Sequence, residues 1–231
     1  MNTQAARAVT TSTGHRSRPR TWPVPAALVA LSAIPLAAGA LRLVQLAGGP
    51  TAIPADHRFA GFPGALVAHI VGAAVFAFLG AFQFLPRLRR RRWHRRAGRV
   101  VAVAGLVVAI SALWLTLFYD PQPGSGAVLF VLRLVFAPAM AACLVLGFTA
   151  IRRRDIAAHR AWMMRTYAIG LAAGTQAFTE GIGEGIFGHG VLVADLSKGA
   201  GWVINLAVAE WLIRRPARRR ANQGRRTHAT A

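Results

Sequence analysis

The chain has 231 residues, of which 55% are hydrophobic and 15% are charged. Ordinary globular domains contain about 25% charged residues, so this composition argues against a soluble protein. The net charge of +21 would suit a nucleic-acid-binding protein, but the arginines are confined to tails and short loops beside apolar stretches. That arrangement argues against nucleic acid and favours the lipid bilayer as the partner, with anionic headgroups at the basic loops.

Six apolar stretches follow one another along the chain. A hydrocarbon core of about 30 Å needs roughly 20 apolar residues in a helix. The predicted spans are approximately residues 24–46, 64–85, 99–118, 127–151, 162–183 and 191–213. The first of them is longer than the apolar region of a signal peptide, so we expect a true span there. We therefore expect an all-α fold, a polytopic membrane helix bundle with six transmembrane helices.

The predicted membrane domain, residues 24–213, is flanked by two segments without apolar periodicity. Residues 1–23 and residues 214–231 are rich in arginine and polar side chains. Segments of this composition cannot bury enough apolar surface to fold. We expect both to be disordered, basic cytoplasmic tails.

The distribution of basic residues predicts the orientation of the bundle. With six spans, both tails and the loops 86–98 and 151–161 lie on one side, and that side with its flanking residues holds 24 arginines. The other side holds Arg58 and Lys198. Basic residues in short loops stay in the cytoplasm. We therefore expect a multi-pass protein of the cell membrane (plasma membrane or bacterial inner membrane) with both termini cytoplasmic.

Polar residues within the predicted spans gather in the outer half of the membrane. Ionisable side chains at this depth are costly and mark candidate functional positions. Gln176, Glu180 and Glu184 are spaced four residues apart, so they share one helix face. The candidate ligand or proton cluster comprises Arg42, His69, Arg133, Gln176, Glu180 and Glu184.

Two interpretations of this cluster stay open. The span arginines, Arg42 and Arg133, are expected to pair with the acids of the same half, because the chain has only seven acids. Those acids are Glu180, Glu184 and Asp195. The pairs would form either a structural ion-pair network that sets helix register, or a site that binds a small ligand or relays protons. Snorkelling to the interface would account for Arg42 alone.

Two histidine–arginine junctions stand at the inner ends of predicted spans. Residues 89–99 read RRRRWHRRAGR and residues 152–165 read RRRDIAAHRAWMMR. If spans two–three and four–five form a parallel repeat, His94 and His159 lie at equal depth. Two histidines at one depth on different helices are what a bis-histidine b-type haem requires. The alternative is that both are interfacial residues, which contact headgroups or cap helix ends.

Three segments carry a resemblance to a known family: FLGAFQFLPRLRRRRWHRRAGRV (78–100), RDIAAHRAWMMRTYAIG (154–170) and GAGWVINLAVAEWLIRR (199–215). They resemble the domain-of-unknown-function (DUF) 2306 family of predicted bacterial integral membrane proteins. The resemblance runs from about residue 69 to residue 215 and implies a membrane fold, but no activity. The fifth predicted span departs from the family pattern at Gln176, so the outer cluster is expected to be particular to a subgroup. The motif positions are His69, His94, Arg95, Arg99, His159, Arg160, Arg165, Asn205 and Glu210.

Three functions remain in competition. In the first, the protein is a membrane protein whose outward-facing polar cluster binds a small ligand or relays protons. In the second, it is a b-type haem or redox protein that uses His94 and His159. In the third, it is a structural or assembly partner without chemistry. The sequence leaves open whether it is an enzyme. No P-loop, HExxH, GxSxG or CxxC pattern occurs, so nucleotide-driven and hydrolytic functions are disfavoured and no metal site is expected.

Overall fold

The computed structural model describes residues 23–228 except 51, 55, 60, 62, 86, 87 and 89–91, with side chains described as far as Arg215. Within these residues all regular structure is helical, with seven α-helices and one short 3-10 helix. The α-helices are α1 Pro23–Leu46, α2 Gly64–Gln83, α3 Arg92–Phe118, α4 Ala127–Arg152, α5 Ile156–Gly170, α6 Ala172–Phe187 and α7 Val191–His228. The 3-10 helix η1, His57–Phe59, lies between α1 and α2.

Five of these helices are long and apolar enough to cross a membrane. They are α1, α2, α3, α4 and the segment Val191–Arg215 of α7. Their positions agree with five of the spans expected from the sequence. The chain is therefore an all-helical membrane protein with several candidate spans, as expected.

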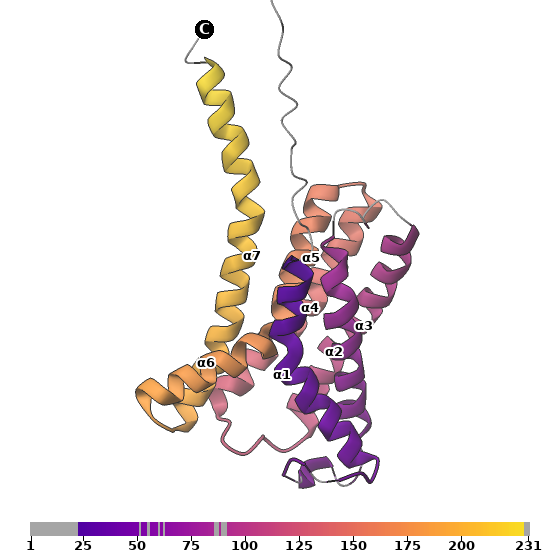
Figure 1. Cartoon of the computed structure of the whole chain (residues 1–231), viewed down its shortest axis with the longest axis vertical. Coiled ribbons are helices and arrows are strands. Elements are labelled where there is room, and N and C mark those ends of the chain that lie inside the picture. The colour runs from indigo at the N-terminus through magenta and orange to yellow at the C-terminus, as the bar shows by residue number, and fades with distance from the viewer. Residues whose placement is uncertain are drawn as a thin grey trace, which may run out of the picture.

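The fifth predicted span differs, because residues 162–183 do not form one helix. The segment is divided between α5, with 15 residues, and α6, with 16 residues. At 1.5 Å per residue each helix is about 22–24 Å long, which is less than the roughly 30 Å of a hydrocarbon core. In Figure 1, α6 leaves the direction of α5 and runs obliquely across the bundle.

The helices pack mainly against their neighbours in the chain. α2 packs on α3, α4 on α5 and α6 on α7, while α1 lies against α2 and α6. The core lies where α2, α3, α4 and α5 meet, and it centres on Phe76, Val108, Met140 and Tyr167. The Tyr167 hydroxyl donates a hydrogen bond to the carbonyl of Ala77 at 2.8 Å, which joins α5 to α2.

Gly80 of α2 makes room for this tyrosine. A Cβ at position 80 would lie 2.5 Å from Cε2 of the Tyr167 ring. On the other side of the ring, Phe84 packs edge-on, with ring centroids 5.1 Å apart. The close approach of α2 and α5 therefore depends on a glycine opposite an aromatic residue.

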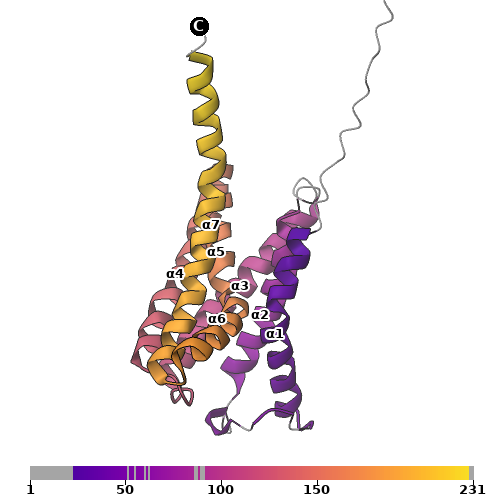
Figure 2. The same cartoon turned by 60° about the vertical axis from the view of Figure 1, so that its left-hand side comes forward.

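The ends of the helices form two groups. The start of α1, the end of α2, the start of α3, the α4–α5 turn and the end of α7 lie toward one end of the bundle, called here the Arg-rich end (Figure 1). The α1–α2 and α3–α4 connections and the α6–α7 turn lie toward the other, the Arg-poor end. The turned view in Figure 2 gives the same grouping. The start of α1 and the end of α7 therefore lie on one side.

The two predicted tails are described unequally. Residues 1–22 lie outside the described part of the chain. At the other end, the backbone of α7 continues as a helix to His228, beyond the span. Residues 214–223 contain five arginines and two alanines, which favour a helix, together with Pro216, which does not. Whether either tail is disordered in solution stays a prediction.

Candidate functional site

The interruption between α5 and α6 at Leu171 is bridged by one side chain of α7. The amide of Asn205 donates a hydrogen bond to the carbonyl of Ala168 at 3.1 Å. Its oxygen accepts a second one from the hydroxyl of Thr175 at 2.7 Å. Broken helices are tolerated in membranes where neighbouring side chains satisfy the backbone groups near the break. Asn205 does this for the Ala168 carbonyl, and its bond with the Thr175 side chain attaches it to the helix on the other side of Leu171.

The break is also where α1 approaches most tightly. Gly174, in the first turn of α6, lies against the main chain of Leu31, and a Cβ at position 174 would collide with the Leu31 carbonyl oxygen. Small residues permit such backbone approach between membrane helices. The polar atoms at the break therefore lie among α1, α5, α6 and α7.

The interface between α6 and α7 contains three polar residues of the predicted cluster. Gln176 donates to the carbonyl of Lys198 at 3.0 Å. The ammonium of Lys198 lies 2.6 Å from a carboxylate oxygen of Glu180, and both side chains are mostly buried. Nearer the turn, Glu184 lies 3.3 Å from the exposed ring of His189. The two glutamates therefore have partners on their own hairpin.

Asp195 has a different role from the one expected. Its side chain is 1% exposed. One carboxylate oxygen accepts from the amides of Gly126 and Leu129, at 3.1 and 3.0 Å, and the other accepts from Gly126 at 3.0 Å. These amides belong to the start of α4, where four donors lack intrahelical partners. Asp195 of α7 thus caps α4 from another helix.

Arg42 also departs from its expected pairing. Its guanidinium donates to the side chain of Gln45 at 2.5 Å and to the carbonyl of Pro54 at 3.0 Å. It therefore holds the connection after α1. The expected ion pair with an acid of α6 or α7 is not formed among the described residues, because the helix end and the loop supply closer acceptors.

Arg133 is half-buried in the second turn of α4, counted from the Arg-poor end. It makes no hydrogen bond or ion pair with any residue that the structure describes. Its charge interacts at longer range with Asp195 and Arg58 and with His69 of α2. Since Asp195 is engaged as a cap, Arg133 lacks a direct counter-ion in the described part of the chain.

His69 lies at a similar depth on α2. Its Nδ1 is 3.1 Å from the hydroxyl oxygen of Ser111 on α3. That hydroxyl donates its single hydrogen to the carbonyl of Val107 at 2.6 Å, so the histidine Nδ1 acts as the donor. Counted from the nearer helix ends, His69, Ser111 and Arg133 are about 8–11 Å inside. Nε2 of His69 remains the nitrogen at which a proton binds.

The six residues of the predicted cluster therefore separate into three places. Arg42 belongs to the α1–α2 connection; Gln176, Glu180 and Glu184 belong to the α6–α7 hairpin; His69 and Arg133 lie in the bundle of α2, α3 and α4. Sequence reasoning missed Ser111 and Thr175, because single hydroxyls are common in membrane helices. The sequence did contain an indication that Lys198 pairs with Glu180, because both residues lie near the outer ends of adjacent predicted spans.

At the Arg-rich end, an ion pair joins α5 to α7. The guanidinium of Arg165 donates to Glu210 at 2.5 Å and lies over the ring of Trp162, 4.6 Å from its centroid. Arg214 approaches the other oxygen of the same carboxylate at 3.2 Å. The remaining basic motif positions, Arg95, Arg99 and Arg160, are exposed.

The two junction histidines occupy the same end of the bundle on different helices. His94 lies in the first turn of α3. His159 lies on α5, and its Nδ1 donates a hydrogen bond to the carbonyl of Gly147 on α4 at 2.8 Å. This bond fixes the ring and leaves Nε2 unprotonated in the neutral form. Among the described residues, no group of three or more His, Cys, Asp or Glu side chains is arranged to hold a metal ion.

Comparison with known proteins gives one match. A family model described as "Predicted membrane protein (DUF2306)" matches residues 66–213. Those residues include α2 to α6 almost entirely and the membrane part of α7, and therefore Asn205 and both of its partners at the break. Neither a curated protein nor a solved structure matches the chain significantly.

Proposed function

The chain belongs to the DUF2306 family of predicted membrane proteins, and from this premise we propose that it crosses the cell membrane six times with both termini in the cytoplasm. In this topology α5 and α6 together make the fifth crossing. The excess of arginines at one end of the bundle supports the orientation, because basic loops stay inside. The location of the α6–α7 turn at the opposite end supports the sixth crossing (Figure 1).

Cysteine labelling of intact cells tests this topology. The single cysteine, Cys143, is replaced by alanine, and single cysteines are then introduced as Gln122→Cys, His189→Cys or Arg153→Cys. The first two lie in Arg-poor connections and the third in the α4–α5 turn. We expect an impermeant maleimide to label positions 122 and 189 in intact cells, and position 153 only after lysis. Protection of position 189 in intact cells would contradict the fifth crossing.

The function proposed for this topology is recognition of a small anion in the outer half of the membrane, at Arg133. The carrying observation is that this half-buried guanidinium has no hydrogen bond or ion pair with the described residues. A cation at membrane depth is costly without a counter-charge. Guanidinium groups bind carboxylates and phosphates in a bidentate manner, so these are the ligand classes that fit.

His69 of α2 supports this proposal by its depth. Its ring lies at the depth of Arg133, and the Ser111 hydroxyl holds it through Nδ1. A protonated His69 would add a second positive charge beside a bound anion. Anion binding would then favour protonation of His69, and protonation of His69 would favour anion binding. One site would thus both bind a ligand and take up a proton.

Thermal unfolding of the purified protein with added anions tests the anion site. A ligand that binds only the folded state raises the unfolding temperature in a saturable manner. We expect sodium acetate or phosphate to do so at constant ionic strength, and Arg133→Gln to remove the effect. Arg42→Gln is the matched control, because Arg42 is the other arginine inside a span and already has partners. If the anion stabilised both variants equally, or did not stabilise the wild type, the result would support a structural role for Arg133 instead.

A haem protein is the second candidate, and the bond from His159 to Gly147 favours it. Metal-bound histidines usually donate their other ring N–H to a carbonyl, which orients the coordinating nitrogen. His94 would supply the second ligand from α3. The test is the visible spectrum of protein purified from cells grown with ample haem. A Soret band that is lost in His159→Ala and in His94→Ala is the expected result, and its absence from the wild type removes this candidate.

A further inference from the structure

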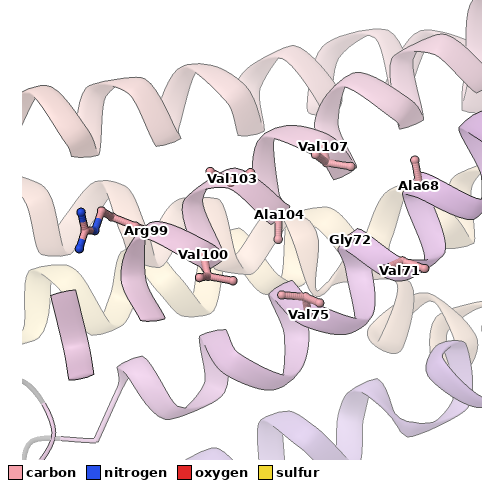
Figure 3. A pocket seen from close by; sticks show the side chains of 9 residues that line it. All are labelled: Ala68, Val71, Gly72, Val75, Arg99, Val100, Val103, Ala104 and Val107. Atoms are coloured by element: carbon pink, nitrogen blue, oxygen red, sulfur yellow. The ribbon is translucent and has the colours of Figure 1, made fainter. Parts of the chain in front are cut away.

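An open groove of about 500 Å³ lies on the outer surface of the bundle between α2 and α3. It is lined by Ala68, Val71, Gly72, Val75, Arg99, Val100, Val103, Ala104 and Val107. Figure 3 shows Arg99 at one end of this row and Ala68 at the other. Eight of the nine residues are apolar. Arg99 lines the groove with the carbon atoms of its side chain, while its guanidinium points beyond the end of the row (Figure 3).

The groove faces outward and not into the helix core. The side chain of Val103 is 63% exposed, and Val71 and Val100 are about half exposed. Gly72 forms its floor, where a Cβ would lie 3.2 Å from Val107. In a membrane, surfaces of this kind are in contact with lipid chains.

Along α3, the groove is about as long as one leaflet is thick. Arg99 and Val107 are eight residues apart on α3, about 12 Å along the helix axis. One leaflet contributes about 15 Å of hydrocarbon. Arg99 lies toward the Arg-rich end of α3, at the depth where a chain meets its headgroup, and Val107 lies near the bilayer middle.

The charge at the end of the groove lacks an acidic neighbour in its own walls. α2 and α3 contain no aspartate or glutamate. Arg92, Arg95 and Arg96 are exposed in the turns that precede Arg99, so they add further positive charge at headgroup level. A positive field of this kind favours anionic headgroups over zwitterionic ones.

From this geometry we propose that the groove is a binding site for one anionic phospholipid of the cytoplasmic leaflet. Its acyl chain lies between α2 and α3 along Val103 and Val75, and its phosphate contacts the guanidinium of Arg99. This proposal does not depend on the anion site at Arg133, since the two arginines that would bind the negative groups, Arg99 and Arg133, lie toward opposite ends of the bundle.

Native mass spectrometry of the detergent-purified full chain tests the proposal, with dioleoylphosphatidylglycerol or dioleoylphosphatidylcholine as the added lipid. We expect the wild type to retain one phosphatidylglycerol in preference to phosphatidylcholine. In Arg99→Gln, retention of phosphatidylglycerol should fall roughly five-fold, as expected for one basic residue near an anionic headgroup. Arg96→Gln, which changes an exposed arginine outside the lining, should have a smaller effect.

A second pair of variants tests the acyl chain. Val103→Trp fills the groove and should reduce retention of both lipids. Ile110→Trp is its control, because Ile110 is 62% exposed on the same helix but does not line the groove. Unchanged retention in Arg99→Gln or in Val103→Trp would overturn the proposal, as would equal retention of the two lipids by the wild type. A dimer that Val103→Trp dissociates would also overturn it, since a second copy would then cover the groove.

Discussion

Asn205 on α7 donates its side-chain amide to the carbonyl of Ala168, three residues before the junction that separates α5 from α6. The same side chain accepts from Thr175, four residues after that junction. The broken segment thus depends on a residue that is distant in the chain. The break also changes the direction of the chain. It turns α6 away from α5, so that Glu180 of α6 lies beside Lys198 of α7.

Asn205→Leu should destabilise the protein. Leucine has nearly the same volume but leaves the Ala168 carbonyl and the Thr175 hydroxyl without this partner. Measured hydrogen bonds between membrane helices contribute about 0.6 kcal/mol on average, so two should cost about 1 kcal/mol. Thermal unfolding in detergent measures the change. Thr175→Val, which removes only one of the bonds, should cost less, and an equal loss in both variants would contradict a bridging role.

Asp195→Ala should destabilise the start of α4 more strongly. It removes a buried carboxylate that accepts from Gly126 and Leu129, and loss of a cap costs about 0.5–2 kcal/mol. Asp195→Asn keeps one acceptor oxygen and should lie between alanine and the wild type. Hydrogen exchange of the amides of residues 126–130 is the measurement. Asp120→Asn, on an exposed acid of the same connection, should leave these rates unchanged.

The Glu180–Lys198 pair should show a positive coupling energy. Its partners are 2.6 Å apart and mostly buried, so we expect a value near the upper limit of surface pairs, about 1 kcal/mol. A double-mutant cycle with Glu180→Gln, Lys198→Gln and the combined variant measures it by thermal unfolding. Simple additivity of the two substitutions would show that the two charges do not stabilise the α6–α7 hairpin.

Acidification should loosen the α1–α2 connection through Asp56. The Arg58 guanidinium, which donates to both carboxylate oxygens, holds the pKa of Asp56 below its ordinary value of 3.8. Because the folded pKa is lower than the unfolded one, this stabilisation is present above pH 3.8 and is lost as the pH falls through the folded pKa. The difference in unfolding temperature between the wild type and Asp56→Asn should therefore be constant near neutral pH and shrink below pH 3.8. If the difference stayed constant at every pH down to acid unfolding, the Asp56–Arg58 ion pair would not be its source.

The membrane class and most helix positions could be predicted because they depend on local properties. An apolar run of about 20 residues must form a helix in a bilayer, where the backbone can only hydrogen-bond to itself. This reasoning located α1, α2, α4 and the membrane part of α7 within two residues, whereas α3 begins seven residues before the predicted third span. It failed at residues 162–183, where hydropathy continues through Leu171 although the helix does not. Gly170 and Gly174 flank the break, but single glycines are frequent in membrane helices and do not locate a break. The residue that bridges it, Asn205, is distant in the chain.

In the candidate site, too, the positions of residues along the chain could be predicted, but their contacts could not. The sequence alone predicted which charged residues lie within apolar runs, since that requires only the position of each charge along the chain. The partner of each was decided by tertiary structure: Asp195 lies at the start of α4, Glu180 beside Lys198, and Arg42 at the carbonyl of Pro54. Side-chain contacts extend only a few ångströms and depend on how helices rotate and cross. Of the two arginines inside predicted spans, Arg42 found acceptors at Gln45 and Pro54, and Arg133 has no close acceptor among the described residues.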